Sequence, residues 1–189
     1  SATFQNAQLA ARELKDKSIE LIDSLSFSTG YGQVVLQAAE WRNAGMGYET
    51  LSRKIREQIQ KLRGVFILES LDYLYHGGRC SAIDKFVSSA LKIRPFLTIQ
   101  RDGNLGVLRK VRGSRMKTVR TLLSFFKEEL LNNKIKRIFL THLDCEAEVQ
   151  FLTDEISKFD HSIEILTANV GCVLATHSGP KPLGIAYSV

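Results

Sequence analysis

The sequence contains no apolar run that approaches the ~18 consecutive residues a transmembrane helix needs. Its first residues also lack the basic and apolar regions of a signal peptide. We therefore expect a cytoplasmic protein without stable membrane insertion. Proline is scarce too: only 3 prolines interrupt a chain in which 44% of the residues are hydrophobic. This composition predicts a packed globule.

Cysteine is the next scarce residue. Cys80, Cys145 and Cys172 are odd in number and widely spaced, and no C-x-x-C pair is present. The pattern indicates free, mostly buried thiols in a reducing compartment and not a disulfide framework.

Motifs that bind phosphate or metal are missing. No G-x-x-x-x-G-K-[ST] loop occurs, and Gly30-Tyr31-Gly32 lacks the third glycine of a dinucleotide fingerprint, so we expect no cofactor. His142 and Asp144 could together bind a metal. A histidine at a strand end beside a helix N-cap aspartate is the simpler interpretation, and we predict no metal site.

The sequence also lacks a nucleophile elbow of the G-x-S-x-G type and an aspartate in a triad context, so we expect a binding protein and not an enzyme. The net charge of +6 fits nucleic acid, an anionic membrane or an acidic partner equally well. The densest basic stretch, residues 109–120, has no interleaved aromatic residues for base stacking, which argues against nucleic acid.

Helices and strands alternate in the first third of the chain. Helices are predicted over residues 3–15 and 31–44, and an amphipathic third helix follows Gly47. A strand is predicted over Ser18–Asp23. This alternation predicts an α/β fold, in which residues 1–63 are the remnant of a Rossmann-like N-terminal α/β domain.

Gly64 marks the predicted start of a second domain, residues 64–189. Its first strand, Val65–Leu68, is continuously apolar, as is typical of a strand covered on both faces. A hairpin is predicted around Asp102-Gly103-Asn104. The other predicted elements complete an α+β domain: a short helix from residue 71, helices at 81–90, 114–132 and 145–159, and strands at 95–100, 105–109, 137–141, 162–166 and 183–189.

The segment Leu71–Arg79 (LDYLYHGGR) is the most informative motif. A short apolar helix ends in two glycines, and an arginine follows at once. An arginine fixed after such a turn can present a planar fork of donors to a carboxylate or phosphate. Two glycines after a helix are also an ordinary C-cap, so the residues alone leave both interpretations open.

Several motifs stand in the order found in the DegV family of bacterial fatty-acid-binding proteins. Residues 1–7 (SATFQNA) resemble S-G-T-Y-Q-S-A, and the Leu71–Arg79 segment resembles L-x-Y-L-x-x-G-G-R. Residues 91–97 are similar to L-N-I-K-P-I-L, and residues 110–112 to K-V-R. Residues 177–187 resemble the closing H-T-G-P-G-x-L-G-I-A-F. Each motif is weak alone, but this many in the same order is specific, and the resemblance covers essentially the whole chain.

The resemblance implies a DegV-type C-terminal domain and a carrier that holds a long-chain fatty acid, such as palmitate, between two domains. It also implies that a fatty acid kinase phosphorylates the bound carboxylate for phospholipid synthesis. The residues implied to bind the carboxylate are Ser1, Thr3, Arg79 and His177. Those implied to dock the kinase are Lys110, Arg112 and Arg115. The candidate acyl-chain contacts, each equally suited to an ordinary core, are Phe66, Leu68, Ile83, Phe86, Val87, Leu91, Ile93 and Phe96.

The chain departs from the family pattern at Ala2, Asn6, Cys80 and Lys181, and it begins at a motif that normally lies well inside a family member. We therefore expect an N-terminal domain that lacks its first part. Two alternatives to a lipid carrier stay open: a nucleic-acid-binding surface, and an interaction fragment without a ligand.

Overall fold

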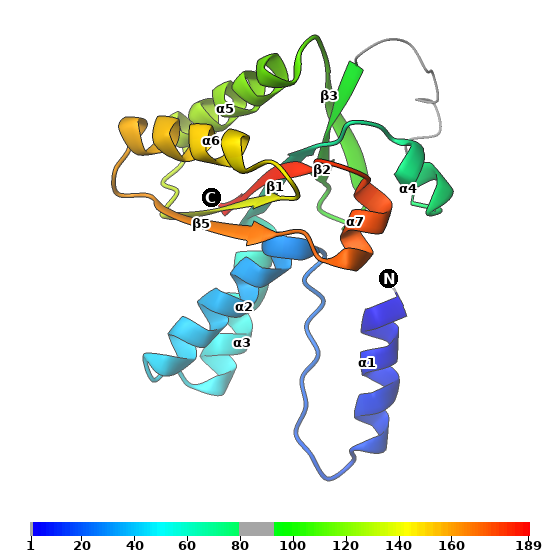
Figure 1. Ribbon diagram of the computed structural model, residues 1–189. Coiled ribbons are helices and arrows are strands. Elements are labelled where there is room, and N and C mark those ends of the chain that lie inside the picture. The colour runs from blue at the N-terminus through cyan, green and yellow to red at the C-terminus, as the bar shows by residue number, and fades with distance from the viewer. Residues whose placement is uncertain (1, 80–92) are drawn as a thin grey trace.

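The computed structural model describes residues 2–79 and 93–189, and these fold around one six-stranded sheet (Figure 1). The strands lie in the order β3-β2-β1-β6-β4-β5, and every neighbouring pair is antiparallel except β4 and β5. The strands are β1 (Leu62–Ile67), β2 (Ile93–Ile99), β3 (Leu105–Arg112), β4 (Arg137–His142), β5 (Glu164–Asn169) and β6 (Leu183–Ser188). The described helices are α1 (Ala2–Glu13), α2 (Ser28–Asn43), α3 (Tyr48–Lys61), α4 (Asp72–His76), α5 (Arg115–Asn132), α6 (Glu146–Phe159) and α7 (Cys172–Ser178).

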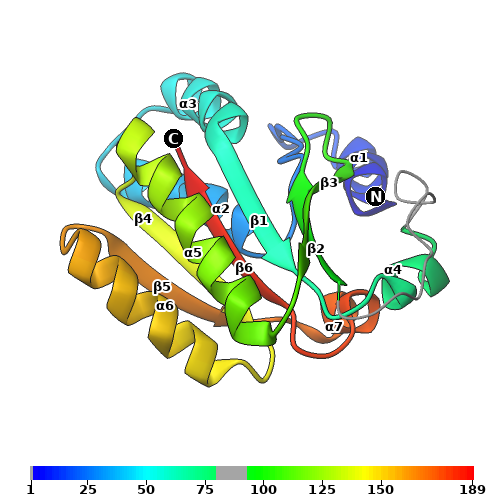
Figure 2. The same ribbon diagram turned by 90° about the horizontal axis from the view of Figure 1, so that it is seen from above.

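Helices α5 and α6 cover one face of the sheet, as both views show (Figures 1 and 2). The main core lies beneath them and includes Phe96, Phe126 and Tyr187, with Phe126 and Tyr187 packed edge to face at 5.1 Å between ring centroids. Helix α2 packs against β1, β4 and β6 from the other side. The sheet therefore separates a densely filled face from a face that is only partly covered.

Strand β6 shows how the sequence produces this difference. Successive side chains of a strand point to opposite faces. Leu183, Ile185 and Tyr187 belong to the main core, so Gly184 and Ala186 lie on the α2 side. Large residues thus alternate with small ones, and the small ones leave a trough along the middle of the sheet.

Most predicted elements of the second domain are confirmed. The hairpin turns at Gly103, whose φ is +82°, and the Asp102 carboxylate accepts from the Asn104 N–H at 2.9 Å. The long helix begins after Ser114, whose hydroxyl accepts from the Lys117 N–H. The helix predicted at residues 81–90 lies outside the described residues, and the domain division at residue 64 stays a prediction.

Two expectations were wrong, and one helix was not predicted. Residues 18–23 form no strand, because no strand within residues 2–79 and 93–189 supplies backbone partners for them. Residues 172–178 form α7, a short helix that was not predicted. The N-cap of α6 is Cys145 and not Asp144, and the His142 Nδ1 atom accepts from the Cys145 N–H at 3.4 Å. Cys145 is buried and Cys172 is exposed; because Cys80 lies outside the described residues, the expectation of mostly buried thiols stays a prediction.

None of the helices within the described ranges is both long and apolar enough to cross a membrane.

Candidate functional site: a cationic cavity beside the sheet

A cavity of about 920 Å³ lies on the α2 side of the sheet. The segment Ser24–Gly30, which leads into α2, forms one wall, and the ends of α4 and α7 form another. Strands β1 and β6 provide the floor through Gly64, Gly184 and Ala186. The trough left by the small residues of β6 is therefore the base of this cavity.

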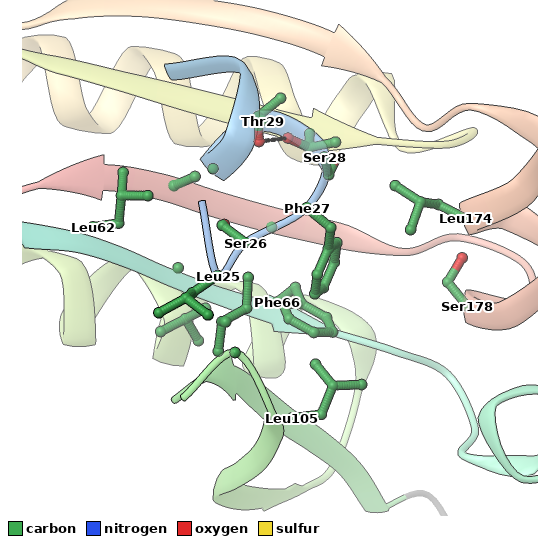
Figure 3. A pocket seen from close by; sticks show the side chains of 18 of the residues that line it. Leu25, Ser26, Phe27, Ser28, Thr29, Leu62, Phe66, Leu105, Leu174 and Ser178 are labelled. Atoms are coloured by element: carbon green, nitrogen blue, oxygen red, sulfur yellow. Dashed lines mark hydrogen bonds between the residues drawn. The ribbon is translucent and has the colours of Figure 1, made fainter. Parts of the chain in front are cut away.

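Aromatic and aliphatic side chains line the middle of the cavity. Phe27 and Phe66 meet edge to face, with ring centroids 5.7 Å apart, and Leu105 lies next to Phe66 (Figure 3). Phe66 pairs with Gly184 across the two strands, and a Cβ placed on Gly184 would lie 2.9 Å from the Phe66 Cβ. Glycine at position 184 therefore leaves room for the Cβ of Phe66 on the neighbouring strand.

The predicted Gly-Gly-Arg turn reaches the rim of the cavity. Gly77 caps α4, Gly78 adopts a φ of +68°, and the Arg79 N–H returns to the Leu74 carbonyl at 2.8 Å. The Arg79 guanidinium donates to the Gly77 carbonyl at 2.6 Å and lines the cavity. The two interpretations of this motif are therefore compatible: the turn caps α4 and places Arg79 at the rim of the cavity.

His177 comes from α7 and meets the same turn. A Cβ placed on Gly77 would overlap the His177 Nδ1 atom, and one placed on Gly179 would overlap the ring of Tyr73. Helices α4 and α7 therefore interlock through two glycines, each against an aromatic ring of the other helix. The His177 Nδ1 atom is buried and has no hydrogen-bond partner among the described residues.

The charges around the cavity have one sign. Its described lining includes Arg63, Arg79 and Arg101, together with His177, but no aspartate or glutamate. Such a lining favours binding of an anion, because an ionised ligand that leaves water is costly to bury unless the protein donates hydrogen bonds to it.

A hydroxyl-rich segment of the wall was missed in the sequence. Ser24, Ser26 and Ser28 line the cavity, and the Thr29 hydroxyl meets the Thr141 hydroxyl at 2.5 Å. Leu25 and Ser28 adopt φ values of +48° and +52°, which non-glycine residues rarely do. The run of alternating serines before α2 was the available signal.

The predicted acyl-chain residues divide into three groups. Phe66 and Leu68 line the cavity. Phe96 is fully buried in the core under α5, on the opposite face of the sheet, and Ile93 is 41% exposed at the start of β2; neither lines it. These two assignments are corrected, because a strand that is apolar on both faces does not reveal which face meets the cavity. Ile83, Phe86, Val87 and Leu91 lie outside the described residues.

The remaining predicted carboxylate ligands lie in or before α1. Ser1 is outside the described residues. Thr3 is exposed in the first turn of α1 and is not part of the cavity lining. The N-terminal end of α1 nevertheless lies on the side of the molecule that carries α4 and α7 (Figures 1 and 2).

The three predicted docking residues do not behave alike. Lys110 and Arg112 are exposed on β3. The Arg115 side chain is only 16% exposed and forms ion pairs with Glu69 at 2.8 Å and Glu148 at 3.2 Å. Arg115 is therefore corrected: its guanidinium is occupied inside the protein. Near it, a shallow depression on α5 is lined by Arg109, Lys117 and Arg120.

A family model described as "Uncharacterised protein, DegV family" matches residues 1–189. The chain belongs to the DegV family. A DegV domain-containing protein of Caldanaerobacter subterraneus subsp. tengcongensis is 35% identical over 191 residues, which cover 99% of this chain and 66% of that protein. The chain thus spans just under two thirds of that relative's length.

Solved DegV structures share the mixed α/β fold. A fatty-acid-binding DegV family protein from Thermus thermophilus superposes with a TM-score of 0.87 at 28% identity, covering 100% of this chain and 67% of that one. DegV from Bacillus subtilis, described as a fatty acid binding protein, gives a TM-score of 0.86 at 26% identity over 100% of this chain and 66% of its own.

Proposed function

We propose that this chain forms the acyl-binding part of a cytoplasmic fatty-acid carrier and is not an enzyme. The observation that carries the proposal is the cavity itself, which joins an apolar trough to arginines and a histidine and whose described lining has no carboxylate. A long-chain fatty acid has the matching chemistry, an apolar tail and a single anionic head.

The energetics agree with this ligand. Burial of a sixteen-carbon tail at ~0.8 kcal/mol per methylene contributes on the order of 10 kcal/mol before costs. Association and ordering remove several of these. An ionised carboxylate taken out of water adds a further cost unless donors meet it. Phe66, Leu68 and Leu105 suit the tail, and Arg79 and His177 suit the head.

The relatives support the same ligand class. The Thermus thermophilus and Bacillus subtilis proteins are both described as binding fatty acids. They extend beyond the region matched here, so further ligand contacts from such a region are part of the proposal. Within this chain, the S-x-T hydroxyls of Ser1 and Thr3 are proposed as additional contacts of the carboxylate.

The second part of the proposal concerns the fate of the bound carboxylate. Held at the rim, near Arg79, this group is accessible to a second protein. We assign that role to a fatty acid kinase, which forms the acyl-phosphate used in phospholipid synthesis. The exposed Lys110 and Arg112 on β3 are the proposed contacts for this partner.

Denaturing extraction of the purified chain, followed by mass spectrometry, tests the binding role. We expect a long-chain fatty acid in stoichiometric amount, or saturable binding of added palmitate if the acid is lost in purification. Retention on heparin with a steep salt dependence, and no lipid or palmitate bound, would instead support the nucleic-acid alternative. Neither lipid nor heparin binding would point to an interaction fragment.

A further inference from the structure

Arg115, at the start of α5, contacts four residues from three separate parts of the chain. Its Nη1 atom donates to Glu69 at 2.8 Å and its Nε atom to Glu148 at 3.2 Å. Its Nη2 atom donates to the Lys181 carbonyl at 3.0 Å and lies 3.2 Å from the Cys145 Sγ atom. A guanidinium presents its donors in a rigid plane, so these contacts fix their partners relative to one another.

Two of these partners belong to the connections of the cavity's rim helices. Glu69 lies between the end of β1 and the start of α4, the helix that leads to Arg79. Lys181 lies between the end of α7, which carries His177, and the start of β6. Lys181 adopts a φ of +52°, so this connection is held in a conformation that a lysine rarely adopts unaided.

We propose that Arg115 is a positioning residue. It fixes the connection before α4 and the connection after α7 relative to each other, and this sets the placement of Arg79 and His177 at the cavity rim. The inference rests on the proposed function, because it assigns a role in binding the carboxylate. Arg115 itself does not line the cavity.

The two rim helices depend on such support. Helix α4 has 5 residues and α7 has 7, and helices this short are not stable without tertiary contacts. Their interlock leaves little tolerance, because Gly77 packs directly on the His177 ring and Gly179 on the Tyr73 ring. A shift of either connection therefore disturbs the Arg79 and His177 side chains together.

Glu69 is suited to hold this position. Arg94 also binds it, through two hydrogen bonds of 2.9 and 2.8 Å, and donates to the Gly113 carbonyl. Burial raises the pKa of the Glu69 carboxyl, but the hydrogen bonds and charges of Arg94 and Arg115 outweigh burial and leave the pKa below its usual value. The carboxylate thus stays ionised at neutral pH.

The chain offers a matched control in Arg137. Its side chain is also 16% exposed and also pairs with two glutamates, Glu40 and Glu164. These contacts join β4 to α2 and β5, and neither glutamate lies in a connection of α4 or α7.

The experiment compares Arg115→Gln, Arg115→Lys and Arg137→Gln with the unmodified chain. Affinity is measured for palmitate and for hexadecanol, which has the same tail without the charge. We expect Arg115→Gln to weaken palmitate binding roughly 3- to 30-fold and hexadecanol binding much less. Arg115→Lys keeps the positive charge but loses the planar set of guanidinium donors. Relative to Arg115→Gln, it should restore the free energy of unfolding more fully than the palmitate affinity. Arg137→Gln should change both ligands little and equally.

A second measurement needs no ligand. Hydrogen exchange should speed up over residues 72–79 and 172–179 in Arg115→Gln and stay unchanged there in Arg137→Gln. If the unmodified chain binds neither probe, the proposed function fails, and the exchange comparison alone decides on Arg115.

Equal losses for acid and alcohol, or the same exchange pattern in both variants, would overturn the positioning role. If Arg115→Gln does not fold, Glu69→Gln replaces it. Glu69→Gln should give the same selective loss of palmitate affinity and the same local exchange, and normal behaviour of this variant would also overturn the proposal.

Discussion

The two faces of the sheet differ in how densely they are packed, although the same strands form both. On the α5 and α6 side, Phe96, Ile138 and Leu140 are fully buried in a continuous core. On the other side, Gly64, Gly184 and Ala186 form the floor of a cavity of about 920 Å³. The first face is densely packed and stabilises the fold, whereas the second leaves an open cavity.

The sharpest way to separate the faces is to truncate one phenylalanine on each. Phe96→Ala opens a void in the filled face, and we expect it to lower the free energy of unfolding by about 3–5 kcal/mol. Phe66→Ala removes a side chain that borders existing space, so its stability cost should be clearly smaller, while its effect on palmitate affinity should be larger. Denaturant unfolding and ligand titration of both variants measure the two effects.

The same loss of stability from both variants would contradict the division of the faces. So would a selective loss of ligand binding from Phe96→Ala, which would return Phe96 to the acyl pocket.

The interlock of α4 and α7 provides the next test. A methyl group at position 77 would overlap the His177 ring, so Gly77→Ala should destabilise the chain by about 1–3 kcal/mol, as overpacking usually does, and should also weaken palmitate binding. Gly171→Ala is the control, because a Cβ at the N-cap of α7 meets no atom within 4 Å. Thermal unfolding and palmitate titration measure the two effects. Equal, small effects of both substitutions would show that the helices do not interlock.

His177 tests the polar end of the cavity by itself. His177→Ala should weaken palmitate binding by about 1–3 kcal/mol, the usual cost of leaving a buried polar or charged group short of a partner. Binding of hexadecanol should change little, since the alcohol brings no charge to satisfy. Isothermal titration with both ligands measures the difference. Equal losses would mean that His177 only supports the loop.

The features that could be predicted are those whose signals are local. The turn at Gly103 and the start of the long helix near Ser114 depend on a few adjacent residues, and both were predicted. Arg79 and His177 were identified through family resemblance, and the structure brings both to one cavity. The residues alone did not distinguish a C-cap from a binding turn, because the same turn caps α4 and brings Arg79 to the cavity.

The errors concern properties that are not local. Ser18–Asp23 has the apolar content of a strand, but a strand also needs a neighbour with which to pair. Strands β1 and β2 carry apolar residues on both faces, so the sequence does not show which face a given side chain is on. Phe66 and Phe96 therefore seemed equivalent in sequence. Arg115 was grouped with its basic neighbours because nothing in the sequence places Glu69, Glu148 and the Lys181 carbonyl around it.

Because Arg115 is engaged in ion pairs, the proposed kinase contact is narrowed to Lys110 and Arg112, and here we expect the smallest effect on palmitate binding. Lys110 and Arg112 are exposed on β3, and rim charges act mainly on association rates and their salt dependence. The double variant Lys110→Ala/Arg112→Ala should therefore slow acyl-phosphate formation by the kinase, most at low salt, and leave palmitate affinity nearly unchanged. Lys134→Ala/Lys136→Ala is the control, since these exposed lysines lie in the connection between α5 and β4. An equal slowing by both pairs would mean that only net charge matters, whereas a loss of palmitate affinity in the first pair would place Lys110 and Arg112 in the binding site.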